Sequence, residues 1–400
     1  LRVMGNLREI GLYVSSVVIT LFNNQPSAKL FANRLMGLGE KVYLHKATKG
    51  YPTDVNLIVS EEGYGANPYI ETTRSLVVIA APGPGSGKLA TCLSQLYHEY
   101  KRGNKAGYAK FETFPVWNLE LENPINVAYE AATADLKDIN SIDPFHFNAY
   151  GKVAINYNRD IEAFPVVKNI LSKIMKGDVV YKSPTDMGVN MLASAITDSD
   201  VVNKAARAEI VRRYFRTSCD YKKGICDKDT AERVELLMQE LEIVPSERKC
   251  VLPAIDASMQ TNSPVIAIEL ANGRVVTGRT KKLIGASAAV VLNALKILTG
   301  IEDPIDLIPP SVLEPILHLK SDILKIKYGV LNLKDVLLAL SISALSYPEA
   351  KRAFDAISEL SGCQGHSSNI LNPSDEDTFR RLNLDITSEP QFLSKNLFEI

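Results

Sequence analysis

The sequence predicts an α/β protein built on a mostly parallel sheet with helices on both faces. Segments that resemble strands alternate with segments of helical period through the first 150 residues. A loop that holds three glycines joins one predicted strand to the helix that follows it. The chain of 400 residues is also long enough for two or three domains, each with its own core.

The first domain, 1–150, carries the alternating elements. The helix 27–38 ends at Gly39, which is a common residue just after a helix. In a parallel sheet the ligand lies beyond the carboxyl ends of the strands, which is where the glycine loop belongs. We expect strands at 12–21, 41–45, 76–80 and 107–111, and helices at 27–38, 88–101 and 125–136.

Two further domains are expected after residue 150. The domain 151–260 is mainly helical, and the domain 261–400 opens with alternating residues around Asn272-Gly273, which is a strong hairpin signal. It continues as helices, so we expect an α+β domain there. The expected helices of the two domains are 161–176, 199–217, 228–241, 246–259, 284–298, 311–320, 333–345 and 348–360.

The composition of the chain indicates which binding partners and which cellular compartment to expect. The formal net charge of -1 gives no reason to expect nucleic acid or an anionic membrane as a partner. The longest apolar stretches, 284–298 and 336–345, are too short to span a bilayer. Five scattered cysteines without a C-x-x-C pair favour a reducing compartment, so we expect a cytoplasmic protein.

The glycine loop is the best candidate for a binding site. Its sequence, A-P-G-P-G-S-G-K, ends where the helix 88–101 begins, and free N–H groups and the helix dipole favour an anion there. Pro82 and Leu89 replace the first glycine and the hydroxyl of the usual phosphate loop G-x-x-x-x-G-K-[ST]. A tight turn that serves close strand–helix packing is the alternative. The residues expected to hold ATP or another phosphate-bearing ligand are Gly83, Gly85, Ser86, Gly87, Lys88 and Thr91.

Four polar residues outside this loop are candidates for catalysis: Asp143, His146, Arg159 and Asp186. Asp143 or Asp186 would hold Mg²⁺ near a phosphate, and Arg159 or His146 would assist its transfer. The alternatives are structural. Asp143 then begins a turn, and the loop 181–191 around Asp186 is a solvated link between domains.

Cys363 and His366 form a Cys-x-x-His pattern near the C-terminus. The thiol and the imidazole suit a nucleophile and its base, or half of a zinc site whose second half is not evident nearby. The alternative is that Cys363 is a buried small hydrophobe.

Several long strings of the sequence resemble one protein family. Among them are APGPGSGK, KAGYAKFETFPVWNL, IDPFH, NYNRDIEAFP, YKSPTDMGVNM and GCQGHSS. Taken in order from about Leu12 to about Pro390, they are similar to the UPF0371 (DUF1846) family. The resemblance implies a multi-domain, bacterial-type cytoplasmic protein with a Rossmann-like α/β part, a helical insertion and a smaller α+β part. It also implies a further N-terminal portion ahead of Leu1.

Some members of that family carry the label of ATP-dependent zinc proteases, which this sequence does not support. A zinc protease of this kind needs H-E-x-x-H so that two imidazoles share one helical face. The nearest match begins at His98-Glu99, and Arg102 stands where the second histidine belongs.

The first functional expectation is therefore a nucleotide- or phosphate-binding enzyme that performs Mg²⁺-dependent phosphoryl transfer or ATP hydrolysis. An enzyme of another class that uses Cys363 is the second. The third is a non-catalytic protein that binds a small phosphorylated molecule and changes its assembly. Small residues from Gly285 to Ala289 suit close helix packing, either between subunits of a homo-oligomer or within one core.

Overall fold

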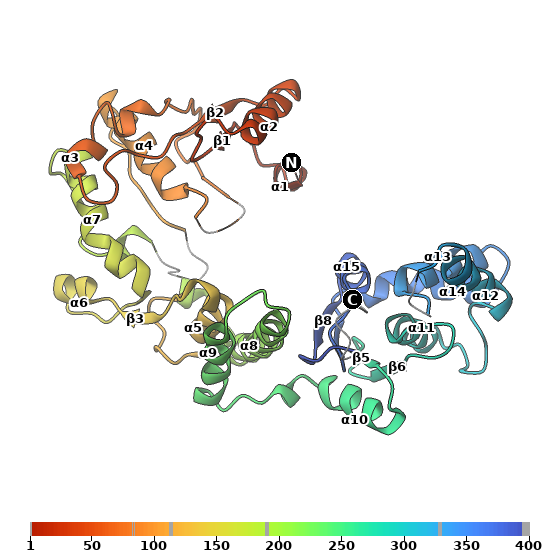
Figure 1. Cartoon of the computed structure of the whole chain (residues 1–400). Coiled ribbons are helices and arrows are strands. Elements are labelled where there is room, and N and C mark those ends of the chain that lie inside the picture. The colour runs from red at the N-terminus through yellow and green to blue at the C-terminus, as the bar shows by residue number, and fades with distance from the viewer. Residues whose placement is uncertain are drawn as a thin grey trace. The chain divides into compact units, whose positions relative to one another are not determined.

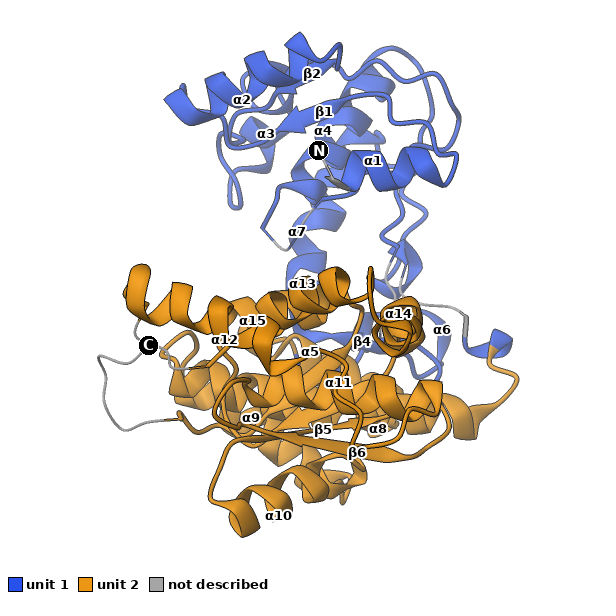
Figure 2. Cartoon of the chain, turned by 90° about the vertical axis from the view of Figure 1, so that its right-hand side faces the viewer, with its two compact units in different colours: residues 1–121, 139–195 blue, residues 122–138, 196–400 orange. Residues whose placement is uncertain are grey.

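A computed structural model describes residues 2–81, 83, 85–111, 115–188, 192–326 and 330–393. Its chain forms two compact units, which Figure 2 distinguishes by colour. Unit 1 comprises residues 1–121 and 139–195, and unit 2 comprises residues 122–138 and 196–400. Helices account for 51% of the residues. The division into three domains stays a prediction.

The expected mostly parallel, Rossmann-like sheet is wrong. Within the described residues the strands form two sheets of two strands and one sheet of four (Figure 1). Strands β1 (Val17–Ile19) and β2 (Val42–Leu44) pair in parallel, whereas β3 (Asn140–Ile142) and β4 (Ile155–Tyr157) pair antiparallel. The fold therefore combines helices and strands without a central parallel sheet.

The expected strand at 76–80 explains much of this difference. Residues 76–80 belong to no strand, and Leu76 and Val78 are 81% and 77% exposed. The segment 107–111 likewise forms no strand, although the backbone N–H of Lys110 donates to the Met187 carbonyl at 2.6 Å. An apolar run marks a strand only where partner strands cover it, and these two runs have none in the described structure.

Unit 1 is built mainly from helices that pack on one another. The pair α4 (Lys88–Lys101) and α7 (Asn158–Ile174) forms its core, where Leu93 and Leu96 meet Phe164 and the residues that follow it. The remaining helices of unit 1 are α1 (Arg2–Glu9), α2 (Pro26–Gly37), α3 (Val55–Ile58) and α6 (Pro144–Tyr150).

The first part of unit 2 is a helical layer. Helix α5 (Pro124–Ala132) packs on α8 (Ser199–Lys222), and α8 packs on α9 (Lys228–Glu240). Asp198 and Asp227 cap α8 and α9, because their carboxylates accept from the N–H groups of Val201 and Thr230. Helix α10 (Val251–Thr261) then leads to the sheet.

The four-stranded sheet of unit 2 has the order β6-β5-β7-β8. The predicted hairpin is confirmed: β5 (Val265–Glu269) pairs antiparallel with β6 (Val275–Arg279), and Gly273 in the turn has φ of 80°. The other two strands, β7 (Gln364–Ser367) and β8 (Asp385–Ser388), pair in parallel. The strand order places β6 at one edge.

Helix α11 (Ala286–Thr299) packs closely on β5 and β6 (Figure 1). A Cβ added to Gly278 would lie 2.1 Å from the Val290 nitrogen, so the contact needs glycine. The small residues expected to pack closely lie inside this unit, since Ala288 is 0% exposed. The helices that complete unit 2 are α12 (Pro310–His318), α13 (Leu333–Ser343), α14 (Pro348–Asp355) and α15 (Pro373–Arg381).

None of the described helices is both long enough and apolar enough to cross a membrane.

Candidate functional site

The glycine loop is fastened to the end of β1. Thr20 follows β1 directly, and its hydroxyl donates to the Ser86 carbonyl at 2.9 Å. Gly87 is the N-cap of α4 and has a left-handed φ of 80°. A Cβ at Gly87 would lie 3.0 Å from the Thr20 side chain. Glycine is therefore required both for the backbone conformation and for the close approach.

The backbone N–H groups of Gly87, Lys88 and Leu89, at the start of α4, donate to no described residue. The first hydrogen bond of the helix runs from the Thr91 N–H to the Gly87 carbonyl at 3.0 Å. Two side chains turn back onto the loop instead. The Lys88 ammonium donates to the Gly83 carbonyl at 3.0 Å, and the Ser86 hydroxyl donates to the same oxygen.

The loop therefore offers unpaired donors at the positive end of a 14-residue helix. Gly85 is exposed, and a Cβ there would meet nothing within 4 Å. Lys88 is exposed as well, whereas Thr91 is 2% exposed and belongs to the interior. An anion can approach the N–H groups from the side of Gly85 and Lys88.

Asp143 is the N-cap of α6 and has a structural role. Its Oδ1 accepts from the N–H groups of Phe145 at 2.9 Å and His146 at 3.1 Å. Its Oδ2 accepts from the hydroxyl of Thr185 at 2.6 Å and from its N–H at 3.3 Å. The carboxylate is fully buried and ties α6 to the loop 181–188. A magnesium-binding role for Asp143 stays a prediction.

His146 and Asp186 lie close together in unit 1. The His146 Nδ1 is 3.1 Å from the Ser183 hydroxyl and 3.9 Å from Asp186 Oδ1. The Asp186 Oδ2 accepts from the N–H of Lys182 at 2.7 Å, the N–H of Ser183 at 3.1 Å and the hydroxyl of Tyr150 at 2.9 Å. The structure thus unites two sequence motifs, IDPFH and YKSPTDM, in one polar cluster.

Arg159 is the second residue of α7, and its guanidinium lies 5.6 Å from the centre of the Tyr157 ring. The Lys110 ammonium stacks on the same ring at 4.3 Å and pairs with Asp160 Oδ2 at 2.6 Å. Asn190, at the end of the predicted polar loop, lies outside the described residues.

The glycine loop and the polar cluster are separate features. Within the described residues, the hydrogen bonds of Asp143, His146 and Asp186 include no residue of the loop 83–88. In the part of the chain that the structure describes, no group of three or more His, Cys, Asp or Glu side chains is placed to hold a metal ion. The role of each residue in magnesium-dependent transfer stays a prediction.

Cys363 and His366 lie on opposite faces of the sheet of unit 2. Cys363 precedes β7 and packs in the apolar core, where burial raises the pKa of its thiol. The His366 ring lies 4.6 Å from the Phe215 ring of α8. Its Nδ1 lies 2.8 Å from the Thr387 hydroxyl, and its Nε2 lies 3.1 Å from Glu389 Oε1. These contacts give no thiol–imidazole pair.

His98 is part of a local packing arrangement rather than a metal centre. Its Nε2 lies 2.7 Å from the Asn67 carbonyl, and its ring contacts Tyr97 and Tyr69 edge-on. Arg102 stacks over the Tyr69 ring at 3.5 Å. The H-E-x-x-R segment therefore supports packing around Tyr69.

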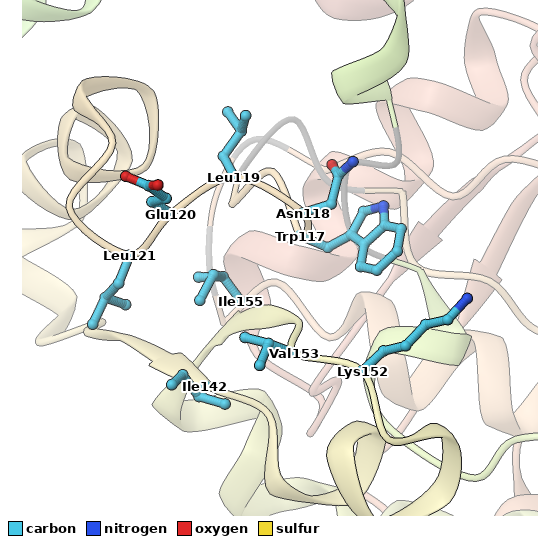
Figure 3. A pocket seen from close by; sticks show the side chains of 9 residues that line it. All are labelled: Trp117, Asn118, Leu119, Glu120, Leu121, Ile142, Lys152, Val153 and Ile155. Atoms are coloured by element: carbon cyan, nitrogen blue, oxygen red, sulfur yellow. The ribbon is translucent and has the colours of Figure 1, made fainter.

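The sequence did not reveal a hollow of about 530 Å³ in unit 1 (Figure 3). Trp117, the only tryptophan of the chain, forms one wall. The one available signal was this lone tryptophan, since large aromatic side chains often line ligand sites. The other lining residues are Asn118, Leu119, Glu120, Leu121, Ile142, Lys152, Val153 and Ile155.

These features define a two-unit protein of mixed helices and strands, with a glycine loop at a helix start and a buried polar cluster in unit 1. The model of the DUF1846 N-terminal domain, a domain of unknown function, matches residues 1–242, and that of the C-terminal domain matches residues 246–398. The chain belongs to the DUF1846 family. This confirms the resemblance found in the sequence.

Relatives of high similarity come from clostridia. A UPF0371 protein of Clostridium botulinum (strain Langeland / NCTC 10281 / Type F) is 54% identical to this chain. A UPF0371 protein of Clostridium tetani (strain Massachusetts / E88) is also 54% identical. Each alignment covers the whole of this chain and 81% of the relative.

Proposed function

We propose that this protein binds a small phosphorylated molecule, with ATP as the first candidate, at the glycine loop. The observation that carries the proposal is the row of N–H groups at residues 87–89, for which no described residue is the acceptor. Helix starts with free N–H groups bind phosphate oxygens, because the donors and the helix dipole act on the same negative charge.

Lys88 supplies the positive charge of the proposed site. Its ammonium now donates to the Gly83 carbonyl, a neutral acceptor within the loop. A phosphate is a stronger acceptor than a carbonyl, so we expect the ammonium to exchange Gly83 for the ligand. Ser86 keeps its hydroxyl bond to Gly83 and preserves the shape of the loop.

Phosphoryl transfer or hydrolysis at this loop is a further step of the proposal. Mg²⁺ would arrive with the phosphates, whereas a role for Asp186, His146 and Arg159 stays a prediction, because the described hydrogen bonds of Asp186 and His146 include no residue of the loop. The carboxylates of Asp143 and Asp186 already accept several protein hydrogen bonds. Binding without turnover, in a protein that senses a phosphorylated metabolite, is therefore the second candidate. All five cysteines are free thiols, which supports the cytoplasm as the proposed location.

Isothermal titration calorimetry with ATP, ADP and pyrophosphate, each with and without Mg²⁺, tests the proposal. We expect Lys88→Met to weaken binding by about tenfold or more, because it removes a charge-assisted hydrogen bond of about 1.5–3 kcal/mol. Lys105→Met is the matched control, since Lys105 is an 83% exposed lysine of the same unit that pairs with Asp178 at 3.5 Å. Equal affinities in both variants, or no binding of any of the three ligands, would contradict the proposal.

A further inference from the structure

The hollow beside Trp117 is separate from the glycine loop and is formed entirely by residues of unit 1 (Figure 3). Its volume of about 530 Å³ lies within the range of small-molecule sites, which is about 300–1,000 Å³. Ile142 comes from β3 and Ile155 from β4, and Val153 lies just ahead of β4. Their side chains form an apolar floor.

The indole wall of the hollow is held firmly. The N–H of Ile155 donates to the Trp117 carbonyl at 2.7 Å, which fixes the backbone of residue 117 beside β4. The indole then meets the His146 ring in an edge contact with 5.8 Å between ring centres. His146 is held in place by its contact with Ser183, so the polar cluster supports the Trp117 indole. A rigid aromatic face costs little ordering entropy when a ligand stacks on it.

Lys152 gives the hollow a positive charge that no described acidic side chain neutralises. Its side chain is exposed, and no described carboxylate lies within 4.0 Å of its ammonium. Figure 3 shows Lys152 on the same side as Trp117, with Glu120 on the far side of the apolar floor. The Glu120 side chain or backbone already interacts with another group of the protein. An anionic group is therefore best placed at the Lys152 end.

We propose that this hollow binds a small aromatic anion, that is, a planar ring system that carries a carboxylate or sulfonate. The ring lies on Val153 and Ile155 against the Trp117 indole, and the anionic group meets the Lys152 ammonium. The apolar floor is the reason to expect a ring system in the ligand. The positive charge of Lys152 is the reason to expect a negative charge on it. This site does not depend on phosphate binding at the glycine loop.

The single tryptophan makes a direct test practical. The probes are 8-anilinonaphthalene-1-sulfonate, which is anionic, and N-phenyl-1-naphthylamine, its neutral analogue. We expect the anionic probe to bind with a stoichiometry of one and to quench Trp117 by energy transfer. Lys152→Met should weaken binding of the anionic probe by about two- to fivefold and leave binding of the neutral probe unchanged, because only an exposed charge contact is lost. Lys105→Met should leave the binding of both probes as it is.

A second pair of variants separates charge from shape. Val153→Asp places a carboxylate on the floor and should abolish binding of the anionic probe, whereas Val153→Asn adds the same volume without charge and should retain part of it. Failure of Trp117 to respond, or equal loss of both probes in Lys152→Met, would overturn the proposal. So would sedimentation that shows a dimer dissociated by Val153→Asp, since the hollow would then be an interface between copies. ATP titrations at the glycine loop are unaffected by any of these results.

Discussion

At the scale of single residues, buried polar side chains are placed by the hydrogen bonds that they make. Asp143 is the clearest case, since four donors from α6 and from Thr185 converge on one fully buried carboxylate. The sequence predicted that Asp143 and His146 are candidates for roles near the same phosphate. It did not show that Thr185, far along the chain, supplies the second half of the arrangement, because sequence order carries no information on such contacts.

Asp143→Ala should therefore destabilise unit 1. It removes a helix cap and leaves the hydroxyl of Thr185 without its acceptor, so we expect a loss of about 2–4 kcal/mol in the free energy of unfolding. Asp54→Ala is the control, because Asp54 is an exposed cap that accepts one bond, from Leu57 N–H, and should cost about 1 kcal/mol. Urea unfolding followed by Trp117 fluorescence measures both. Equal losses would show that the Thr185 bridge adds nothing.

His366 gives a prediction of pH dependence. Burial lowers the pKa of its imidazole, with the Arg248 charge acting in the same direction and Glu389 opposing them. The ring has a hydrogen-bond partner at each nitrogen, Glu389 at Nε2 and Thr387 at Nδ1. Because the folded pKa lies below the unfolded value of about 6.5, the unfolded chain binds the proton more tightly. The stabilisation is therefore complete above about pH 6.5 and is lost as the pH falls through the folded pKa.

Denaturant unfolding of unit 2 between about pH 5 and pH 7.5 measures this effect. His366→Gln should show a smaller decrease in stability at the acidic end than the unsubstituted protein. His318→Gln is the control, because His318 has a side chain that is 64% exposed and should keep the full decrease. An unchanged pH profile in His366→Gln would mean that other groups cause the decrease.

At the scale of elements, local signals predicted helices well. The predicted helix 88–101 matches α4 (Lys88–Lys101), and 228–241 matches α9 (Lys228–Glu240) within one residue. Their period and caps lie within the segment itself. The parallel sheet was wrong because a strand depends on partners from elsewhere in the chain. The run 76–80 has strand composition but no partner strand in the described structure, and Leu76 is exposed.

The contact between α11 and β6 provides a test at this scale. Gly278→Ala places a Cβ 2.1 Å from the Val290 nitrogen, so α11 must move away from the sheet, at a cost of about 1–3 kcal/mol. Gly285→Ala is the matched control at the start of the same helix, where the nearest atom lies at 3.6 Å. We expect it to cost less, about 0.5–1 kcal/mol, because Gly285 is the N-cap of α11 and alanine is a poorer cap than glycine. Thermal unfolding followed by far-UV circular dichroism compares them, and a neutral Gly278→Ala would show that the two elements lie further apart.

At the scale of the whole molecule, the chain leaves unit 1 and returns to it. Residues 122–138 belong to unit 2, although residues on either side of them belong to unit 1. No composition shift in the sequence marks these crossings. The hollow was not predicted for a similar reason. Trp117 precedes residues 122–138 in the sequence and Lys152 follows them, and the hydrogen bond between Ile155 and Trp117 helps to bring both to the same hollow.

We expect the two units to respond separately to substitution. Trp117 lies in unit 1, so its fluorescence reports that unit alone, whereas circular dichroism reports the helices of both. Gly278→Ala should shift the dichroism transition and leave the fluorescence transition in place. Asp143→Ala should shift the fluorescence transition. Coincident shifts in both variants would show that the chain unfolds as one cooperative body.

One calorimetric comparison tests phosphate binding at the glycine loop most directly. Gly85 has a left-handed φ of 69° and open space around it, and both Asp and Asn tolerate that backbone conformation. We predict that Gly85→Asn binds ATP nearly as well as the unsubstituted protein, and that Gly85→Asp loses binding by more than about tenfold because a carboxylate repels the phosphates. Equal ATP affinity in the two variants would contradict a phosphate site at this loop.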